Sequence, residues 1–223
     1  MPHRTRRTGI LFDVDGTLVD TNYFHVLAWW RAFQEHGVQI SMAALHDLIG
    51  MGAKQAIERV TGASDDAIRE AHSRHYAEFR GEVRAFPGAR ELVRTVHERG
   101  ALAILATGAE KDDLDAILRA LDLGDALDAL VSDADVERSK PAPDIFNEAL
   151  RRGALEPADA MVVGDSVWDC SAALAAGLRC VAVRSGGVGM EELRAAGAIT
   201  VYPGVKELLE NLDESPLRSL LPR

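Results

Sequence analysis

Six short apolar segments recur along the chain, and most are separated by amphipathic patterns of about ten residues that are typical of helices. Strands and helices that alternate in this way form parallel sheets, because helical crossovers cover both faces of the sheet. We therefore expect an α/β fold with three layers. The expected strands are residues 10–12, 101–106, 127–131, 160–163, 180–183 and 199–202, and the expected helices between them are 89–99, 111–121, 144–152 and 168–176.

Residues 20–86 interrupt this alternation, because they contain amphipathic patterns but no convincing strand. We predict a helical cap domain at residues 20–86, inserted after the first strand, and a core domain built from residues 1–19 and 87–213. The tail at residues 214–223 has two prolines and no clear pattern, and we expect it to be loosely ordered. The helices expected in the cap are residues 24–34, 43–48, 54–60 and 65–79.

The composition limits the classes of partner. The chain has 35 acidic and 25 basic residues and a net charge of -10, which argues against binding to nucleic acid or to an anionic membrane. No segment approaches the ~18 apolar residues of a membrane span. The two cysteines, Cys170 and Cys180, do not make a disulfide framework and are expected to be buried thiols in a reducing compartment. We expect a cytoplasmic protein; the sequence leaves the oligomeric state open.

Polar residues follow several of the expected strands. Asp13 and Asp15 follow the first strand, Thr107 follows the second and Asp165 follows the fourth, while Lys140 lies in the loop after the third. Ligands of open α/β sheets bind beyond the carboxyl ends of the strands. We therefore expect these four loops to converge on one site.

The residue types indicate a site for a cation and a phosphate group. The two carboxylates after the first strand suit Mg²⁺, which prefers oxygen ligands, and Gly16 permits a tight turn beside them. Asp165 could add a third carboxylate. Lys140 would neutralise the charge of a phosphate, and Thr107 and the amide of Gly108 would hydrogen-bond its oxygens at a helix N-terminus.

In this order, the motifs resemble the four signatures of the haloacid dehalogenase-like (HAD) superfamily. The first reads DVDGT at residues 13–17, and the second is a threonine after a strand, Thr107. The third is a lysine before proline, at Lys140, and the fourth is the acidic segment GDSVWD at residues 164–169. The resemblance covers about residues 9–205. It implies a Rossmann-like core, with a small cap like that of the phosphoglycolate phosphatase and β-phosphoglucomutase branch.

The resemblance also implies a mechanism. Asp13 would attack phosphorus and become an acyl phosphate, and Asp15 would protonate the leaving oxygen and then activate water. Mg²⁺ would be held by Asp13, the main-chain carbonyl of Asp15, and Asp165. Lys140 and Thr107 would bind the phosphate. The substrate would be a small phosphorylated metabolite.

The fourth signature and the second each raise one further point. Asp169 would orient Lys140, or it could make only a surface ion pair. Many relatives continue the second signature with Asn-Ser or Ser-Ser, whereas this chain has Gly108-Ala109. The main-chain amides remain, but side-chain contacts to the substrate at these two positions are lost.

Single residues of these types also have ordinary structural roles, since Asp favours turns and helix caps. In the cap, His25 and Trp29 lie on one face of the first helix and either pack internally or face the substrate. Lys54 follows a Gly-Met-Gly segment that resembles the substrate-specificity loop of the cap, but a solvated lysine is the favoured alternative. His72 and His75 are expected on a helix surface, without a metal.

Two function classes remain open. The favoured one is hydrolysis of a small phosphate monoester, with phosphoglycolate as the default by family analogy alone. The rival is isomerisation of a sugar phosphate, as in β-phosphoglucomutase, but Gly164 stands where that mutase carries a glutamate. Three other functions are disfavoured. Dehalogenases lack an acid at the position of Asp15, and phosphonate-cleaving enzymes usually have a small residue there. A non-catalytic binding module should have lost some of Asp13, Asp15, Lys140 and Asp165, and none is missing.

Overall fold

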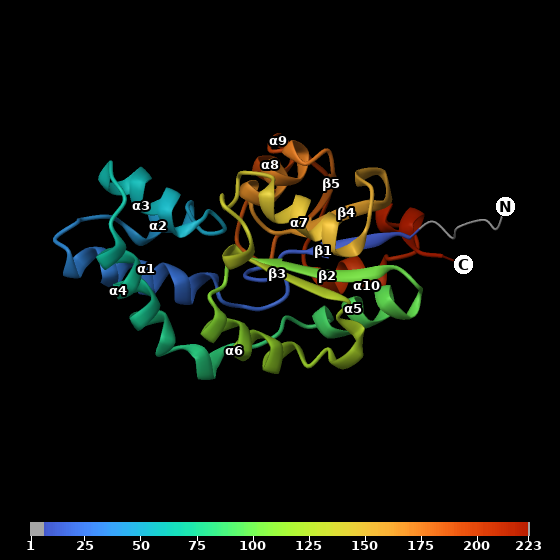
Figure 1. Ribbon diagram of the computed structural model, residues 1–223, viewed down its shortest axis with the longest axis horizontal. Helices are drawn as coiled ribbons and strands as arrows, with labels where there is room; N and C mark the ends of the chain where they lie inside the picture. The colour runs from blue at the N-terminus through green and yellow to red at the C-terminus, as the bar shows by residue number, and fades with distance from the viewer. Residues whose placement is uncertain (1–6, 223) are drawn as a thin grey trace.

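The computed structural model describes residues 7–222, except for the side chain of Lys111. Within these residues, six parallel strands form one sheet in the order β3-β2-β1-β4-β5-β6, as Figure 1 shows. Residues 1–6 of the expected core and Arg223 of the expected tail lie outside the described residues. The strands are β1 (Gly9–Phe12), β2 (Leu102–Thr107), β3 (Ala129–Ser132), β4 (Ala160–Gly164), β5 (Arg179–Val183) and β6 (Ala198–Tyr202).

Helices cover both faces of this sheet, which confirms the expected three-layer α/β fold (Figure 1). One face is covered by α5 (Ala89–Glu98), α6 (Lys111–Leu121) and α10 (Val205–Glu210), whose apolar residues share one buried cluster with the strands. The other face is covered by α7 (Asp144–Gly153), α8 (Val167–Ala175) and α9 (Met190–Ala195), which contribute to a second cluster.

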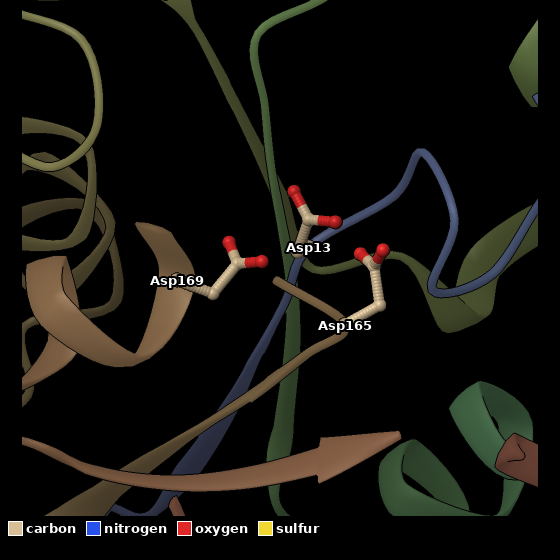
Figure 2. A group of neighbouring side chains, drawn as sticks. All are labelled: Asp13, Asp165 and Asp169. Carbon is tan, nitrogen blue, oxygen red and sulfur yellow. The ribbon is translucent and has the colours of Figure 1, made fainter. Parts of the chain in front are cut away.

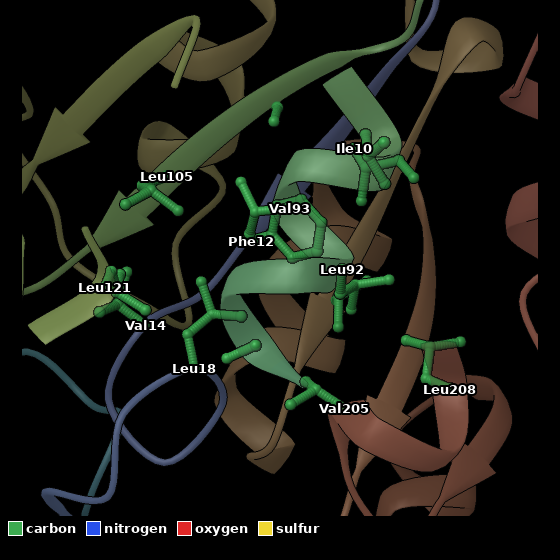
Figure 3. Close-up of a cluster of buried hydrophobic side chains, with 14 of the residues drawn as sticks. Ile10, Phe12, Val14, Leu18, Leu92, Val93, Leu105, Leu121, Val205 and Leu208 are labelled. Atoms are coloured by element: carbon green, nitrogen blue, oxygen red, sulfur yellow. The ribbon is translucent and has the colours of Figure 1, made fainter. Parts of the chain in front are cut away.

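The central strand β1 is apolar throughout because it faces both clusters. Ile10 and Phe12 point into the first cluster and Leu11 into the second, and all three are fully buried. Figure 3 shows Ile10 and Phe12 beside Leu92 and Val93 of α5. A continuous apolar run is therefore what a strand buried on both faces requires.

Four helices lie between β1 and the rest of the sheet in sequence: α1 (Asn22–Glu35), α2 (Met42–His46), α3 (Ala53–Thr61) and α4 (Asp66–Ala77). They enclose a third apolar cluster of their own and lie to one side of the sheet (Figure 1). The two connections to them run side by side, since Val19 and Ala85 form an antiparallel bridge and the amide of Asp20 donates to the carbonyl of Arg84 at 2.9 Å. This grouping fits the predicted cap at residues 20–86, which stays a prediction.

The expected strands and helices all occur, and no boundary differs by more than two residues. The short helices α9 and α10 were not expected. The expectation of a loosely ordered tail was wrong: residues 216–220 form a 3₁₀ helix, and Leu217, Leu220 and Leu221 are buried in the first cluster. Thr8 anchors this segment by donating to the carbonyl of Leu220 at 2.5 Å. The tail is ordered because its leucines cover apolar surface beside β1.

None of the helices in the described part of the chain is both long enough and apolar enough to cross a membrane.

Candidate active site

Asp13 and Asp165 lie side by side at the carboxyl edge of the sheet because they follow the neighbouring strands β1 and β4. The amide of Asp13 continues the ladder by donating to the carbonyl of Val163 at 2.9 Å. Thr17 links the two carboxylates: its hydroxyl oxygen lies 3.0 Å from Oδ2 of Asp13 and 2.9 Å from Oδ1 of Asp165. Asp13, Thr17 and Asp165 are all buried. Thr17 was part of the first motif, but sequence reasoning gave its hydroxyl no role.

Lys140 reaches the same point from the loop before α7. Its ammonium group donates to Oδ1 of Asp13 at 2.5 Å and to Oδ1 of Asp169 at 2.8 Å. Burial acts to lower the pKa of Lys140, but the charges of Asp13 and Asp169 raise it overall, so the side chain stays cationic. Of the two alternatives for Asp169, the structure shows the first: the side chain is buried beside Lys140 instead of making a surface ion pair.

The start of α8 explains why Asp169 is held in this position. Ser166 caps the helix by accepting from the amide of Asp169 at 3.2 Å, and Oδ2 of Asp169 accepts from the hydroxyl and amide of Ser166 at 2.6 and 3.1 Å. This reciprocal arrangement is a capping box. One carboxylate oxygen of Asp169 is therefore occupied by the helix cap and the other by Lys140.

The carboxylates fit a hard divalent cation. Oxygens of Asp13, Asp165 and Asp169 lie within 4.8 Å of one another, and Figure 2 shows Asp13 between the other two. Burial and the charge of Asp169 raise the pKa of Asp13 to about 7 in spite of Lys140, and burial raises the pKa of Asp165 well above its usual range. If all three buried carboxylates around the one ammonium group are ionised, two negative charges lack a counter-charge. A divalent cation would balance them.

Within this group, Thr17 bridges Asp13 and Asp165, whereas Asp169 is held by Lys140 and by the cap of α8, so we expect the cation between Asp13 and Asp165. The side chain of Asp15 is not part of the group, which agrees with the expectation that Asp15 would contribute its main-chain carbonyl. The metal ligands Asp13, Asp15 and Asp165 remain a prediction.

The carboxylate of Asp15 lies on the side of the site that faces α1. Its Oδ1 accepts from Thr21 at 2.7 Å and lies 3.4 Å from Nε2 of His25, while Oδ2 accepts from Thr107 at 3.2 Å. Burial acts to raise the pKa of Asp15, but the hydrogen bond and charge of His25, with the bond from Thr21, outweigh it and lower the pKa. The side chain is therefore ionised in the free protein.

Thr107 and Gly108 occupy different places. Thr107 is fully buried, and its hydroxyl accepts from the amide of Ala109 at 3.1 Å while it donates to Asp15. Gly108 and Ala109, by contrast, line the cavity above the site. Gly108, and not Thr107, is thus the residue of this pair that lines the cavity.

A cavity of about 460 Å³ opens above these residues, between the sheet edge and the four inserted helices. Asp13, Asp15 and Lys140 line it from the core. His25 and Lys54 line it from the inserted helices, which is one of the alternatives that the sequence left open for each, although the Lys54 side chain is 72% exposed.

His72 also lines the cavity, so the expectation that it lies on a helix surface was wrong. Its ring stacks on Trp29 with centroids 3.9 Å apart, and its Nε2 lies 3.3 Å from Nδ1 of His25. Burial lowers the pKa of His72 well below its usual value, so it is neutral. The face of α4 that carries His72 packs against α1. His75 pairs with Glu35 at 2.6 Å and its side chain is only 14% exposed, so the expected surface position was wrong for His75 as well.

The inserted helices are closed over the site in this structure. The amide of Gly52 donates to the carbonyl of Lys140 at 3.2 Å, and Nε2 of His46 lies 2.9 Å from the carbonyl of Gly186. Gly52 packs so tightly that a Cβ there would collide with the side chain of Ser139. This close approach explains the glycines of the segment that precedes Lys54.

Comparisons with known proteins agree with this geometry. The family model of haloacid dehalogenase-like hydrolases matches residues 10–183, a range that contains all four motifs. The fructose-1-phosphate phosphatase YqaB of Escherichia coli is 32% identical over 185 residues, which cover 80% of this chain and 97% of that protein. A phosphoglycolate phosphatase of Nitrosospira multiformis is 33% identical over 180 residues, 75% of this chain and 79% of that protein.

One relative is much longer. The chloroplastic protein SUPPRESSOR OF QUENCHING 1 of Arabidopsis thaliana is 30% identical over 188 residues, which are 80% of this chain but 18% of that protein. Among solved structures, a hydrolase from Pseudomonas syringae is 32% identical with a TM-score of 0.88, and the match covers 93% of this chain and 99% of that one. The chain therefore belongs to the family of haloacid dehalogenase-like hydrolases, and it is a phosphatase of that family.

Proposed function

We propose that this protein is a Mg²⁺-dependent hydrolase of a small phosphate monoester and that it acts through an aspartyl-phosphate intermediate. The observation that carries the proposal is the contact between Lys140 and Asp13 at the floor of the cavity, with Asp165 beside them. A buried carboxylate next to a fixed ammonium group can attack a phosphorus atom whose negative charge the ammonium group offsets.

In the first half of the reaction, an oxygen of Asp13 forms a bond to phosphorus while the bond from phosphorus to the ester oxygen breaks. Asp15 gives its proton to the departing oxygen, which leaves as an alcohol. Asp15 is ionised in the free protein, but the negative charge of a bound phosphate raises the pKa of a nearby carboxyl group. We therefore expect Asp15 to gain its proton when the substrate binds.

In the second half, ionised Asp15 takes a proton from water, and the water oxygen bonds to phosphorus. The bond between phosphorus and Asp13 breaks, which releases inorganic phosphate and restores the carboxylate. His25 and Thr21 hold the Asp15 carboxylate between the two halves through their contacts to Oδ1.

The phosphate group would be held by Lys140 and by the amide of Gly108, which line the same cavity. Mg²⁺ would be held by the carboxylates of Asp13 and Asp165 and by the main-chain carbonyl of Asp15. It would supply positive charge that polarises the phosphoryl group. The inserted helices exclude bulk water by closing over the cavity through Gly52 and His46.

One observation favours hydrolysis over the mutase alternative. A Cβ built at Gly164 would lie 2.5 Å from Cβ of Asp169, a distance that real Cβ atoms do not show. The glutamate that the mutases carry at this position therefore does not fit beside Asp169 in its present conformation. Since Asp169 holds Lys140, the site is built for glycine at residue 164.

The leaving group would lie against His25, His72 and Lys54 on the helical side of the cavity. A volume of about 460 Å³ admits more than a two-carbon ester, so the phosphoglycolate default rests on family analogy and not on fit. Relatives are named for fructose 1-phosphate and for phosphoglycolate. The class we propose is a small phosphorylated metabolite.

The test is a panel of phosphate esters assayed with the purified protein and Mg²⁺. The panel contains 2-phosphoglycolate, fructose 1-phosphate, other sugar phosphates, nucleotides and p-nitrophenyl phosphate. We expect release of inorganic phosphate from at least one small ester. A separate reaction with β-glucose 1-phosphate and a bisphosphate primer tests the mutase alternative. Formation of glucose 6-phosphate without phosphate release would overturn the hydrolase proposal.

A further inference from the structure

Asn22, the first residue of α1, reaches out of the inserted helices to the cation site. Its side-chain amide donates to Oδ2 of Asp165 at 3.0 Å and to the carbonyl of Gly186 at 3.2 Å. The residue is 4% exposed. Asp165 thus accepts from Thr17 through one oxygen and from Asn22 through the other.

The orientation of this amide is fixed by its neighbours. Asp165 and the carbonyl of Gly186 can only accept, so the NH₂ group of Asn22 must face them. Its carbonyl oxygen, Oδ1, is then buried and has no hydrogen-bond partner among the described residues. An unpaired buried acceptor costs about 1–3 kcal/mol, so a donor is expected at this point. The waters that Mg²⁺ keeps in its coordination shell are donors.

The main chain packs closely around this contact. Gly16 has φ = 77°, and a Cβ there would collide with the amide of Asn22 and with Asp165. A Cβ at Gly186 would also collide with Asp165. Two glycines therefore let the main chain close around the pair of Asn22 and Asp165.

We propose that Asn22 is a positioning residue for the cation: it orients the Asp165 carboxylate and ties the first turn of α1 to the occupied metal site. The inference rests on the proposed function only in taking the cation to be Mg²⁺. Residues that hydrogen-bond to a metal-ligating carboxylate orient it and thereby affect the affinity for the metal. Because Asn22 belongs to the inserted helices and Asp165 to the core, cation binding and the position of α1 favour one another reciprocally.

A purely structural role for Asn22 predicts something different. The same hydrogen bonds could serve only to attach α1 to the core. Removal of the side chain would then lower the stability of the protein and leave the affinity for Mg²⁺ unchanged. The affinity of the substrate-free protein for the ion separates the two roles.

The experiment measures Mg²⁺ binding to the full chain by titration calorimetry without substrate. Asn22→Leu keeps the approximate size of the side chain and removes both of its polar groups. Asn22→Ala is a second, smaller substitution in case the leucine variant misfolds. Tyr23→Phe is the control. Tyr23 is 65% exposed in the same turn, and phenylalanine keeps the ring that stacks on His46 with centroids 5.5 Å apart. We expect the Kd for Mg²⁺ to rise about 10- to 100-fold in both Asn22 variants and to stay unchanged in the control.

Hydrogen exchange gives a second readout. Mg²⁺ should protect the amides at the start of α1 in the wild type and in Tyr23→Phe, but not in the Asn22 variants. Unchanged Mg²⁺ affinity in both Asn22 variants would overturn the proposal, as would a wild type that binds no Mg²⁺. A wild type that binds Mg²⁺ but hydrolyses no ester would overturn the proposed function and leave this inference intact.

Discussion

The ammonium group of Lys140 lies 2.5 Å from Oδ1 of Asp13, although 127 residues separate the two in sequence. Both side chains are buried, so solvent screens their interaction weakly. Asp169 holds the lysine from its other side at 2.8 Å. The position of the lysine is therefore set by two carboxylates, one that we expect to react and one that we expect to orient it.

Asp13→Asn should abolish turnover and leave the fold intact. Asparagine has the same shape as aspartate, but its amide is not a nucleophile toward phosphorus. We expect the rate of phosphate release to fall by about a thousandfold or more. The assay is phosphate release by purified protein, with circular dichroism to verify folding. Asp144→Asn, in an ion pair with Arg138 away from the cavity, is the matched control. Retained activity in Asp13→Asn would reject the covalent mechanism.

Removal of the metal should stop hydrolysis. With EDTA present, ionisation of all three buried carboxylates would leave two negative charges without a counter-charge, and the phosphoryl group loses its polarising partner. Adding excess Mg²⁺ should restore the activity, and thermal unfolding should show a higher Tm with Mg²⁺ than with EDTA. A protein whose activity and Tm are both indifferent to EDTA would exclude a metal from the mechanism.

Asp169→Asn should lower kcat by about 100-fold, because misplacing a group by about 1 Å costs a factor of that order. The asparagine can either cap α8 at Ser166 or accept from Lys140, but its single carbonyl oxygen cannot serve both as the carboxylate does. Ser166→Ala removes only the cap contact and should reduce kcat much less. Equal losses in the two variants would assign Asp169 to the helix cap alone.

Gly164→Ala should destabilise the protein and reduce its activity. The new Cβ would meet Cβ of Asp169 at 2.5 Å, so the start of α8 must shift. Overpacking of this kind costs about 1–3 kcal/mol in the free energy of unfolding. Urea unfolding measures the cost. In Gly81→Ala, by comparison, the added methyl group meets nothing within 4 Å, and that variant should stay near the wild type.

The stability of the metal-free protein should fall as the pH rises from about 4 to about 7. Burial raises the pKa of Asp13 from 3.8 to about 7, so the folded state binds a proton that the unfolded state has lost in this range. The free energy of unfolding then decreases by at most about 1.4 kcal/mol per pH unit for this group. Urea unfolding in EDTA at several pH values measures the slope.

Asp13→Asn serves as the control for this pH dependence. The asparagine does not titrate, so the variant should lose less stability than the wild type between pH 4 and pH 7. Mg²⁺ should also flatten the slope in the wild type, because the cation compensates the ionised carboxylate. A wild-type slope equal to that of Asp13→Asn would show that Asp13 is already ionised throughout this range.

The sequence by itself determined the layers of the fold and the loops that meet at the candidate site. A strand buried on both faces must be apolar throughout, as β1 is. A short continuous apolar run therefore predicts a central strand of a sheet that is covered on both faces. Parallel strands end at one edge, so the residues after them had to converge there. Asp13 and Asp165 could be expected at one site without coordinates, because each lies at the end of its strand, but only the structure shows that the two strands are neighbours.

Only the tertiary structure decided contacts that depend on how separate elements pack. Helical periodicity did not predict the contact of His72 with Trp29, because the two rings stack only once α4 packs against α1. The leucines of the tail showed no period, and their burial beside β1 is a property of the assembled sheet. Nothing in the sequence pattern indicated that Asn22 would lie at the site. Its contact with Asp165 joins residues 143 apart, and a hydrogen bond between loops leaves no periodic trace in either segment.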